Sequence, residues 1–183
     1  MHYTVMTSAV CNVCVVWEGK NDRFRVRRIF LLERGADARR HIKRFYQEAT
    51  RSQCKGVDAL LRGIRRYFKS GSIGFDLSDT HMAGRSKFEN NVYKATAHIP
   101  PGKVASYRTL ASMCDCRSAR AIGRVMAKNP YPLLVPCHRV IHSSGKIGGF
   151  QTGPLMKRRL LELEGVKFDE SGTVPKSFFL CKR

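Results

Sequence analysis

A cysteine, a histidine and an arginine follow one another at Cys137-His138-Arg139, directly after an apolar run that ends in Pro136. A cysteine is a nucleophile only as the thiolate, and apolar burial suppresses that form unless a base or a cation lies nearby. His138 could be the base, but adjacent side chains on an extended chain diverge. The chain must therefore turn sharply after Pro136, or the imidazole must reach the sulfur through a water molecule.

A histidine that acts as a base usually needs a third group that fixes its tautomer. Glu164 is our candidate, because the predicted last helix (154–165) carries its charges against its own dipole. These charges are Lys157, Arg158 and Arg159 near the positive end, and Glu162 and Glu164 near the negative end. Contact with phosphates would stabilise the basic set, and contact with an imidazole would stabilise a glutamate. Without further context, Cys137 and His138 also suit two buried residues with no chemistry, or a cysteine hydrolase that uses Glu164.

The net charge points to the class of partner. Lys and Arg number 34 against 14 Asp and Glu, which gives a net charge of +20 in 183 residues. A surface this positive attracts phosphate backbones or anionic membranes. No apolar run reaches the roughly 18 residues that a spanning helix needs, and the amino terminus shows no basic leader before a long apolar stretch. We therefore expect a nucleic-acid partner, no membrane and no secretion.

The seven cysteines favour a reducing compartment, in which thiols stay free, bind metal or react. We expect an intracellular protein, nuclear in a eukaryote and cytoplasmic in a prokaryote. Cys11-x-x-Cys14 could be half of a metal site, but its complement, Cys114-x-Cys116, is too tightly spaced for a zinc ribbon. Cys11 and Cys14 would also point to opposite faces of a strand. We therefore predict no metal and read these thiols as small buried hydrophobic groups.

The first half of the chain mixes strand and helix patterns. They predict a β-hairpin or meander over 3–32 around the turn Gly19-Lys20-Asn21-Asp22, and helices over 37–48 and 57–68. The segment 69–84 is rich in Gly, Ser and Asp, and it reads as a boundary or a connecting strand. We place an amino-terminal domain at 1–84 and a second domain at 85–183.

The second half is mostly helical. Ser86, Ser106 and Ser118 can each cap a helix; 130–140 reads as extended, and Gly153-Pro154 opens the last helix. The two helices after Ser106 and Ser118, joined by a tight turn, make a helix-turn-helix pattern. The second of these helices carries Arg120, Arg124 and Lys128 on one face, with Arg120 near the end that enters a DNA groove in such motifs. The alternative is a solvated charge stripe on a helical hairpin.

Five strings between 88 and 166 together resemble the O6-alkylguanine-DNA alkyltransferases (methylated-DNA–protein-cysteine methyltransferases). They are IPPGKVASYRTLA, RAIGRVMAKNP, PCHRV, SSGKIGGF and LLELEG. Residues 1–84 match the family only in general character. The resemblance implies an α/β protein with an amino-terminal ribonuclease-H-like α/β domain. The second domain would be a mainly helical carboxy-terminal alkyltransferase domain with a helix-turn-helix, winged-helix-like.

The resemblance also implies a reaction, the direct repair of O6-alkylguanine in DNA. Cys137 would accept the alkyl group permanently, so that each molecule acts once and inactivates itself. His138 would take the thiol proton through a water, with Glu164 orienting the imidazole. The damaged base would be flipped out of the duplex, with Arg120 in the gap and Tyr107 donating a hydrogen bond to the leaving guanine.

Further residues follow from the same resemblance. Asn129 would tie the recognition helix to the active-site turn. The base pocket would be lined by Met126, the Val140 carbonyl, Gly149, Phe150 and Gln151, and DNA would be met by Ser106, Tyr107, Ala119, Arg120, Arg124 and Lys128. Arg139 would pair with a carboxylate. No cofactor is expected. The partner would be double-stranded DNA containing O6-alkylguanine, bound by a monomer, with cooperativity along DNA left open.

Three rival functions remain at this stage. A lesion-binding protein without catalysis could use the same scaffold, although relatives of that kind replace the cysteine that is Cys137 in this chain. A cysteine hydrolase would leave the net charge of +20 and the helix-turn-helix unexplained. A plain DNA-binding regulator would leave Cys137 unreactive.

Overall fold

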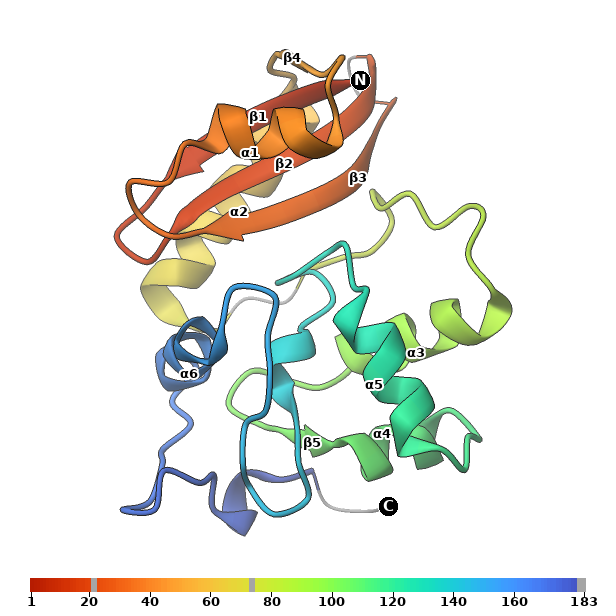
Figure 1. Ribbon diagram of the computed structural model, residues 1–183, viewed down its shortest axis with the longest axis vertical. Coiled ribbons are helices and arrows are strands. Elements are labelled where there is room, and N and C mark those ends of the chain that lie inside the picture. The colour runs from red at the N-terminus through yellow and green to blue at the C-terminus, as the bar shows by residue number, and fades with distance from the viewer. Residues whose placement is uncertain (21–22, 73–74, 181–183) are drawn as a thin grey trace.

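The computed structural model describes residues 1–20, 23–72 and 75–180, and its first half is built on a four-stranded sheet (Figure 1). The strands β1 (His2–Thr7), β2 (Asn12–Lys20) and β3 (Arg23–Leu32) form an antiparallel meander. The short strand β4 (Thr50–Arg51) adds parallel to β1, so that the order is β3-β2-β1-β4. The predicted meander is confirmed. Asn21 and Asp22 of its predicted turn lie outside the described residues.

Two helices cover opposite faces of this sheet, with α1 in front and α2 behind in Figure 1. Ile42 of α1 (Ala38–Phe45) packs on one face with Phe30, and Ile64 of α2 (Lys55–Ser70) packs on the other with Val15. Both predicted helices are confirmed, with shifted ends. Every helix in the described part of the chain is too short or too polar to span a bilayer.

Cys11 and Cys14 lie on opposite faces of the sheet, as their spacing predicts. Cys11 joins the core on the α2 side, Cys14 joins the core on the α1 side, and both are fully buried. Burial raises the pKa of each thiol to about 12. Within the described residues no group of three or more His, Cys, Asp and Glu side chains could hold a metal ion. Both thiols therefore act as small apolar groups in the core.

The second half consists of short helices around a two-stranded parallel sheet. Its elements are α3 (Lys87–Ala97), β5 (Ala105–Ser106), α4 (Tyr107–Met113), α5 (Ala119–Ala127), the 3-10 turn η1 (Cys137–Arg139), β6 (Val140–Ile141), α6 (Pro154–Leu163) and the 3-10 turn η2 (Lys176–Phe178). Ser86, Ser106 and Ser118 cap α3, α4 and α5 through their side chains, as predicted. The helices α4 and α5 pack together, and the turn between them is closed by Asp115 with a left-handed φ of 50°.

The segment 130–140 differs from the prediction. Only Val140 and Ile141 form a strand, and the preceding residues make turns that end in η1. The cause is the side chain of Asn129, which accepts from the Tyr131 N–H and donates to the Val135 carbonyl, each at 2.9 Å. These bonds close a loop that an extended chain cannot make. The chain thus turns sharply after Pro136 into η1, which was one of the two arrangements expected from the sequence.

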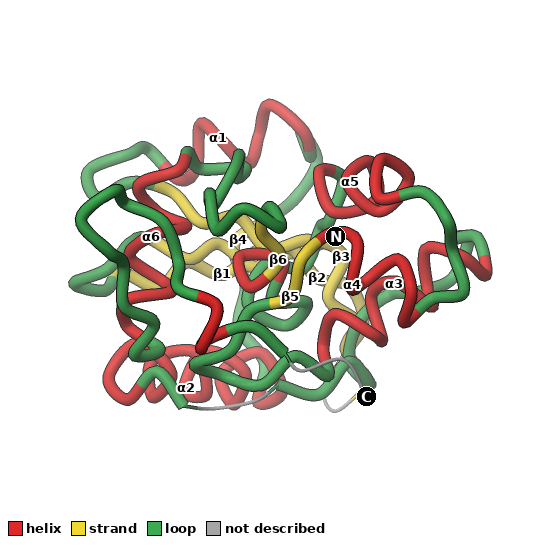
Figure 2. The backbone as a smooth tube through the Cα atoms, turned by 90° about the horizontal axis from the view of Figure 1, so that it is seen from below, coloured by secondary structure: helices red, strands yellow, loops and turns green. Residues whose placement is uncertain are grey.

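One hydrophobic core runs through both halves of the chain. It joins Trp17 and Ile64 from the first half to Leu110 and Val135 from the second. Backbone hydrogen bonds reinforce the contact, because the Ile29 N–H donates to the Pro130 carbonyl. The segment 79–81 also pairs with β3: the Val26 N–H donates to the Asp79 carbonyl, and the His81 N–H donates to the Val26 carbonyl. Figure 2 shows the two halves from below, with α2 opposite α1 and α5. The division at 84 stays a prediction.

A buried ion pair fastens the end of α6 to η1. Arg139 donates from Nε and Nη2 to the Glu164 carboxylate at 2.8 to 3.1 Å, and neither side chain is more than 4% exposed. Burial alone would raise the pKa of Glu164, but the hydrogen bonds and charges of His138 and Arg139 outweigh it and hold the pKa at about 2. The carboxylate is therefore ionised in the folded protein at neutral pH.

We expect this carboxylate to govern stability in acid. Because its folded pKa of about 2 lies below the ordinary 4.5, its contribution is complete above pH 4.5 and is lost as the pH falls toward 2. Glu164→Gln should lower the unfolding free energy at pH 7 by about 3 kcal/mol, since it leaves Arg139 buried without its counter-charge. It should also flatten the acid dependence measured by urea titration. Glu162→Gln, in an exposed pair with Arg158, is the control, and equal acid slopes in all three proteins would contradict the assignment.

Candidate active site

A cavity of about 300 Å³ opens between the second-half elements and has the Cys137 thiol in its wall. It is lined by Tyr107 from α4, by Gly123, Met126 and Ala127 from α5, by Cys137 from η1, by Gly149, Phe150 and Gln151 from the loop after β6, and by Lys157 from α6. Of the predicted pocket residues, Met126, Gly149, Phe150 and Gln151 are among them. Four segments thus converge on the fifth, η1, which carries the thiol.

Cys137 is protonated at rest. Only 6% of the residue is exposed, and burial raises the pKa of its thiol, against the opposing effects of a hydrogen bond with Asn129 and the charge of Lys157. A buried thiol of this kind needs a base to become a nucleophile. The required base must reach the sulfur from inside the protein.

His138 supplies a suitable base. Its Nε2 lies 2.8 Å from Oε1 of Glu164 and 3.3 Å from the Tyr67 hydroxyl, which itself donates to Glu164 at 2.6 Å. Since both neighbours of Nε2 can accept, we assign the proton to Nε2. Nδ1 then keeps its lone pair, and it is buried with no hydrogen-bond partner among the described residues. Burial lowers the pKa of His138, against the raising effect of Glu164, so the ring is neutral and can accept a proton.

Lys157 was missed as a site residue. We expected it to meet phosphates, but it is 1% exposed, and its Nζ donates to the Val140 carbonyl at 2.7 Å and more weakly to that of Gly149 at 3.4 Å. Burial lowers the pKa of its ammonium to about 8, with Cys137 opposing the shift. The sequence could have indicated that Lys157 faces the site, because Lys157, Leu160 and Glu164 lie on one face of a helix at spacings of three and four residues.

The Val140 carbonyl accepts a hydrogen bond from the Lys157 ammonium, and Val140 is fully buried and is not among the residues that line the cavity. Its predicted contact with the base stays a prediction. Arg139 pairs with a carboxylate as predicted, and that carboxylate belongs to Glu164. Asn129 joins the end of α5 to the turn before Cys137, and its carbonyl also receives the side-chain amide of Gln151.

Tyr107 and Phe150 form aromatic parts of the cavity wall. Tyr107 is half-buried, and burial raises the pKa of its hydroxyl, so that it is a neutral hydrogen-bond donor at physiological pH. Its ring packs 5.5 Å from that of His142. A neutral phenol beside the thiol can donate to a leaving group on which negative charge develops.

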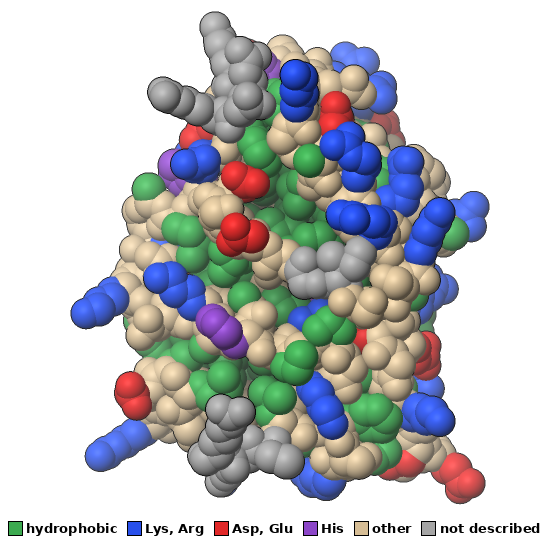
Figure 3. Space-filling view, turned by 180° about the vertical axis from the view of Figure 1, so that it is seen from behind, with side chains coloured by type: hydrophobic (Ala, Val, Ile, Leu, Met, Phe, Trp, Pro, Cys, Tyr) green, Lys and Arg blue, Asp and Glu red, His purple; other side chains and the backbone are tan. Residues whose placement is uncertain are grey.

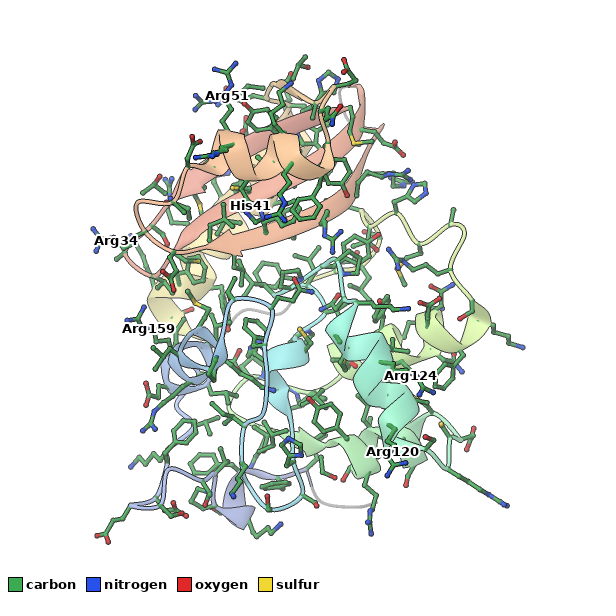
Figure 4. All side chains as sticks on the ribbon, in the orientation of Figure 1. Arg34, His41, Arg51, Arg120, Arg124 and Arg159 are labelled. Atoms are coloured by element: carbon green, nitrogen blue, oxygen red, sulfur yellow. The ribbon has the colours of Figure 1, made fainter. Side chains whose placement is uncertain are left out.

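The outer face of α5 is basic and next to the cavity. Arg120, Arg124 and Lys128 are exposed, and Figure 4 shows Arg120 and Arg124 along this helix. Ala119 begins α5 and is partly buried. Ser106 differs from the expectation of a DNA contact: it is 5% exposed, and its hydroxyl accepts from the Thr109 N–H at 2.9 Å as the cap of α4.

Comparison with known proteins gives a family match for the second half of the chain. Residues 87–166 match the family model described as 6-O-methylguanine DNA methyltransferase, DNA binding domain. A methylated-DNA–protein-cysteine methyltransferase of Methanothermobacter thermautotrophicus is 36% identical over 113 residues, which cover 62% of this chain and 64% of the relative. One of the same name from Saccharolobus solfataricus is 48% identical over 83 residues, covering 45% of this chain and 54% of the relative. The chain thus spans less than two thirds of these curated relatives.

Solved structures extend the likeness over both halves. The Mycobacterium tuberculosis OGT in complex with DNA is 28% identical, with a TM-score of 0.71 over 90% of this chain and 92% of that one. The O6-methylguanine-DNA methyltransferase of Pyrococcus kodakaraensis KOD1 is 25% identical, with a TM-score of 0.69 over 90% of this chain and 99% of that one. The mixed α/β architecture agrees with both. The second half of the chain, with its buried and relay-linked cysteine, therefore matches the 6-O-methylguanine DNA methyltransferase family model, and the fold of both halves is similar to that of solved O6-methylguanine-DNA methyltransferases.

Proposed function

We propose that this protein repairs O6-alkylguanine in double-stranded DNA by a single, irreversible transfer of the alkyl group to Cys137. The observation that carries the proposal is the cavity of about 300 Å³ that places this thiol within reach of a ligand beside the exposed basic face of α5. The similarity to relatives named methylated-DNA–protein-cysteine methyltransferase supports the same reaction.

The transfer is a displacement at the alkyl carbon. The Cys137 proton moves to Nδ1 of His138 through a water, and the imidazolium that forms is stabilised by Glu164. The sulfur then attacks the alkyl carbon, a C–S bond forms, and the C–O6 bond breaks with its electron pair on the guanine oxygen. Tyr107 donates a hydrogen bond to the departing guanine anion. The anion takes a proton from water on release, and the imidazolium of His138 returns its extra proton to water. Lys157 offsets the charge of the transient thiolate.

The base must leave the duplex to reach this thiol, because Cys137 lies in a cavity and not on the surface. The exposed Arg120 side chain near the start of α5 is suited to fill the gap that the base leaves. Arg124 and Lys128 follow on the same face and suit phosphate contacts. Binding should be largely independent of sequence and weakened by salt.

The proposal extends to the finer features of the family. It includes a ribonuclease-H-like fold for 1–84, a winged-helix-like helix-turn-helix within 85–183, and action as a monomer on DNA. It also includes an intracellular location, in the nucleus of a eukaryote or the cytoplasm of a prokaryote.

Cys137→Ala is expected to abolish transfer and to keep binding to damaged duplex, since the mutation removes the nucleophile alone. The measurement is intact-protein mass after mixing with duplex DNA that carries one O6-methylguanine, followed by peptide mapping. The unmodified protein should gain one methyl group on the peptide that contains Cys137, and guanine should be restored. Lesion-selective binding without an adduct would instead make the protein a damage sensor, and an adduct on Cys137→Ala would overturn the acceptor assignment.

Arg120→Ala should slow repair in duplex DNA by at least tenfold and leave the reaction with free O6-benzylguanine base nearly unchanged, because flipping costs a few kcal/mol only in a duplex. Single-turnover rates on both substrates measure the ratio. Arg117→Ala, which removes an exposed arginine just before α5, is the matched control. Equal losses on duplex and free base would show that Arg120 acts in some other way.

A further inference from the structure

We propose that Tyr67, on helix α2 of the first half, is a positioning residue for alkyl transfer. The inference rests on the proposed function and adds a residue from outside the region matched by the family model, which is 87–166. Tyr67 would act through Glu164 and His138 without touching the substrate.

The hydroxyl of Tyr67 is in direct contact with both members of the relay. The residue is 1% exposed, and its Oη lies 2.6 Å from Oε1 of Glu164 and 3.3 Å from Nε2 of His138. A phenol has one proton, and the shorter contact shows that it goes to the carboxylate. Toward His138 the oxygen can therefore only accept. Tyr67 and Glu164 together hold the Nε2–H and leave Nδ1 as the base.

The Tyr67 hydroxyl stays protonated at neutral and moderately alkaline pH, so its hydrogen bonds persist there. Burial raises the pKa of its hydroxyl far above the ordinary value, and the negative charge of Glu164 raises it further. The phenol therefore stays neutral and adds no charge to the ion pair of Glu164 and Arg139. The phenol orients the imidazole of His138, because its one hydroxyl, fixed on a rigid ring, donates to Glu164 and accepts from His138.

The end of α2 is fixed against the end of α6, which holds Tyr67 in place. Gly71 caps α2 with a left-handed φ of 65°, and its N–H donates to the Tyr67 carbonyl at 2.8 Å. A Cβ built at Gly71 would overlap the carbonyl oxygen of Leu163, the residue just before Glu164. Only glycine lets the two helix ends approach this closely. The phenol and the carboxylate are thus brought together by backbone packing as well as by their own bond.

Tyr67→Phe keeps the ring and removes only the hydroxyl. We expect transfer to slow by about three- to tenfold, the effect of one net hydrogen bond, and to slow equally on damaged duplex and on free O6-benzylguanine. The pH of half-maximal reaction should fall, because the imidazolium loses one of its two acceptors and the neutral form of His138, which acts as the base, then persists to lower pH. Affinity for duplex DNA should not change. Tyr131→Phe, which removes another buried hydroxyl bonded to the His81 carbonyl, is the control and should react normally.

The outcomes separate this inference from the proposed function. If the unmodified protein transfers no methyl group, the proposed function fails. If it transfers methyl and Tyr67→Phe has the same rate and pH profile, Tyr67 is only a packing residue. Gly71→Ala provides a second test, because it displaces α2 from α6 and should reduce the rate on free base even in samples that remain folded by circular dichroism. An unchanged rate in folded Gly71→Ala would also count against the inference.

The basic face of α1 carries an independent inference: we infer that it is a second contact for the backbone of the bound duplex. Arg39, Arg40 and Arg44 are exposed, and the helix contains no acidic residue. None of the ion pairs found in residues 1–20, 23–72 and 75–180 uses a basic side chain of α1. Phe45, 52% exposed, stacks on Phe30 at 5.6 Å and adds an aromatic surface to the charges.

The position of α1 makes one continuous duplex a suitable partner. Figures 1 and 2 show α1 and α5 on the same side of the molecule and α2 on the opposite side. Figure 4 shows that Arg34 and Arg51 flank α1 in the same view as Arg120 and Arg124. A duplex held by α5 that continues toward α1 would meet a second set of cations. This inference also rests on the proposed function, because it takes α5 as the primary DNA contact.

The test compares two triple variants of equal charge. The first variant changes Arg39, Arg40 and Arg44 of α1 to Ala. The second changes the exposed Arg62, Arg65 and Arg66 of α2 to Ala. Because lysine and arginine side chains also gather on the rear face (Figure 3), the second variant is a matched control for the loss of charge. For a long undamaged duplex, the α1 variant should lower the slope of log affinity against log salt by up to about 2.7, or 0.9 for each phosphate contact. The α2 variant should leave it unchanged.

Reaction with free O6-benzylguanine should be normal in both triple variants, which keeps this test separate from the alkyl-transfer chemistry. A short duplex that spans only the lesion should bind the α1 variant and the unmodified protein alike. Equal slopes in the two triple variants on the long duplex would show that α1 adds only to the overall charge, and the inference would then be rejected.

Discussion

The buried carboxylate of Glu164 is the constraint on which the rest of the site depends. An ionised carboxylate in a protein interior is costly unless charge and hydrogen bonds surround it. Glu164 meets this requirement with the Arg139 guanidinium, the Nε2–H of His138 and the Tyr67 hydroxyl. Its donors come from α2 and η1, and it lies itself at the end of α6. A single charge therefore fixes three segments that are far apart in the sequence.

The same arrangement explains how a buried thiol stays unreactive until it is needed. Burial lowers the pKa of His138 and raises the pKa of Cys137, so the imidazole is neutral and the thiol is protonated, while Arg139 balances the charge of Glu164. Thiolate formation moves one proton between neighbouring residues and leaves the imidazolium next to the carboxylate. The charges that form in the reaction thus meet counter-charges that are already in place. Under the proposed function, in which the thiol reacts once, a protonated resting state would limit its loss to other electrophiles.

Local signals in the sequence were sufficient for the helices and their caps. Ser86, Ser106 and Ser118 begin helices because each side chain can accept from a backbone N–H three residues on. The role of Glu164 could also be predicted from the sequence, because a carboxylate at the negative end of a helix dipole is unfavourable unless it has a partner. The segment 130–140 was wrongly read as extended, since its turns depend on two bonds from Asn129 that hydrophobic pattern does not encode. The family motifs pointed to Cys137 and Tyr107, which now share one cavity.

Tyr67 had no comparable signal. It sits among the apolar residues of α2, and its position fits a core tyrosine as well as a relay residue. Its two partners are 71 and 97 residues away, so only the docking of α2 on α6 shows that they meet. This docking gives the first half a direct part in the candidate active site. Tyr67 contributes a hydroxyl to the hydrogen-bond network of Glu164 and His138, and Gly71 at the end of the same helix permits the close packing against Leu163 that places this hydroxyl.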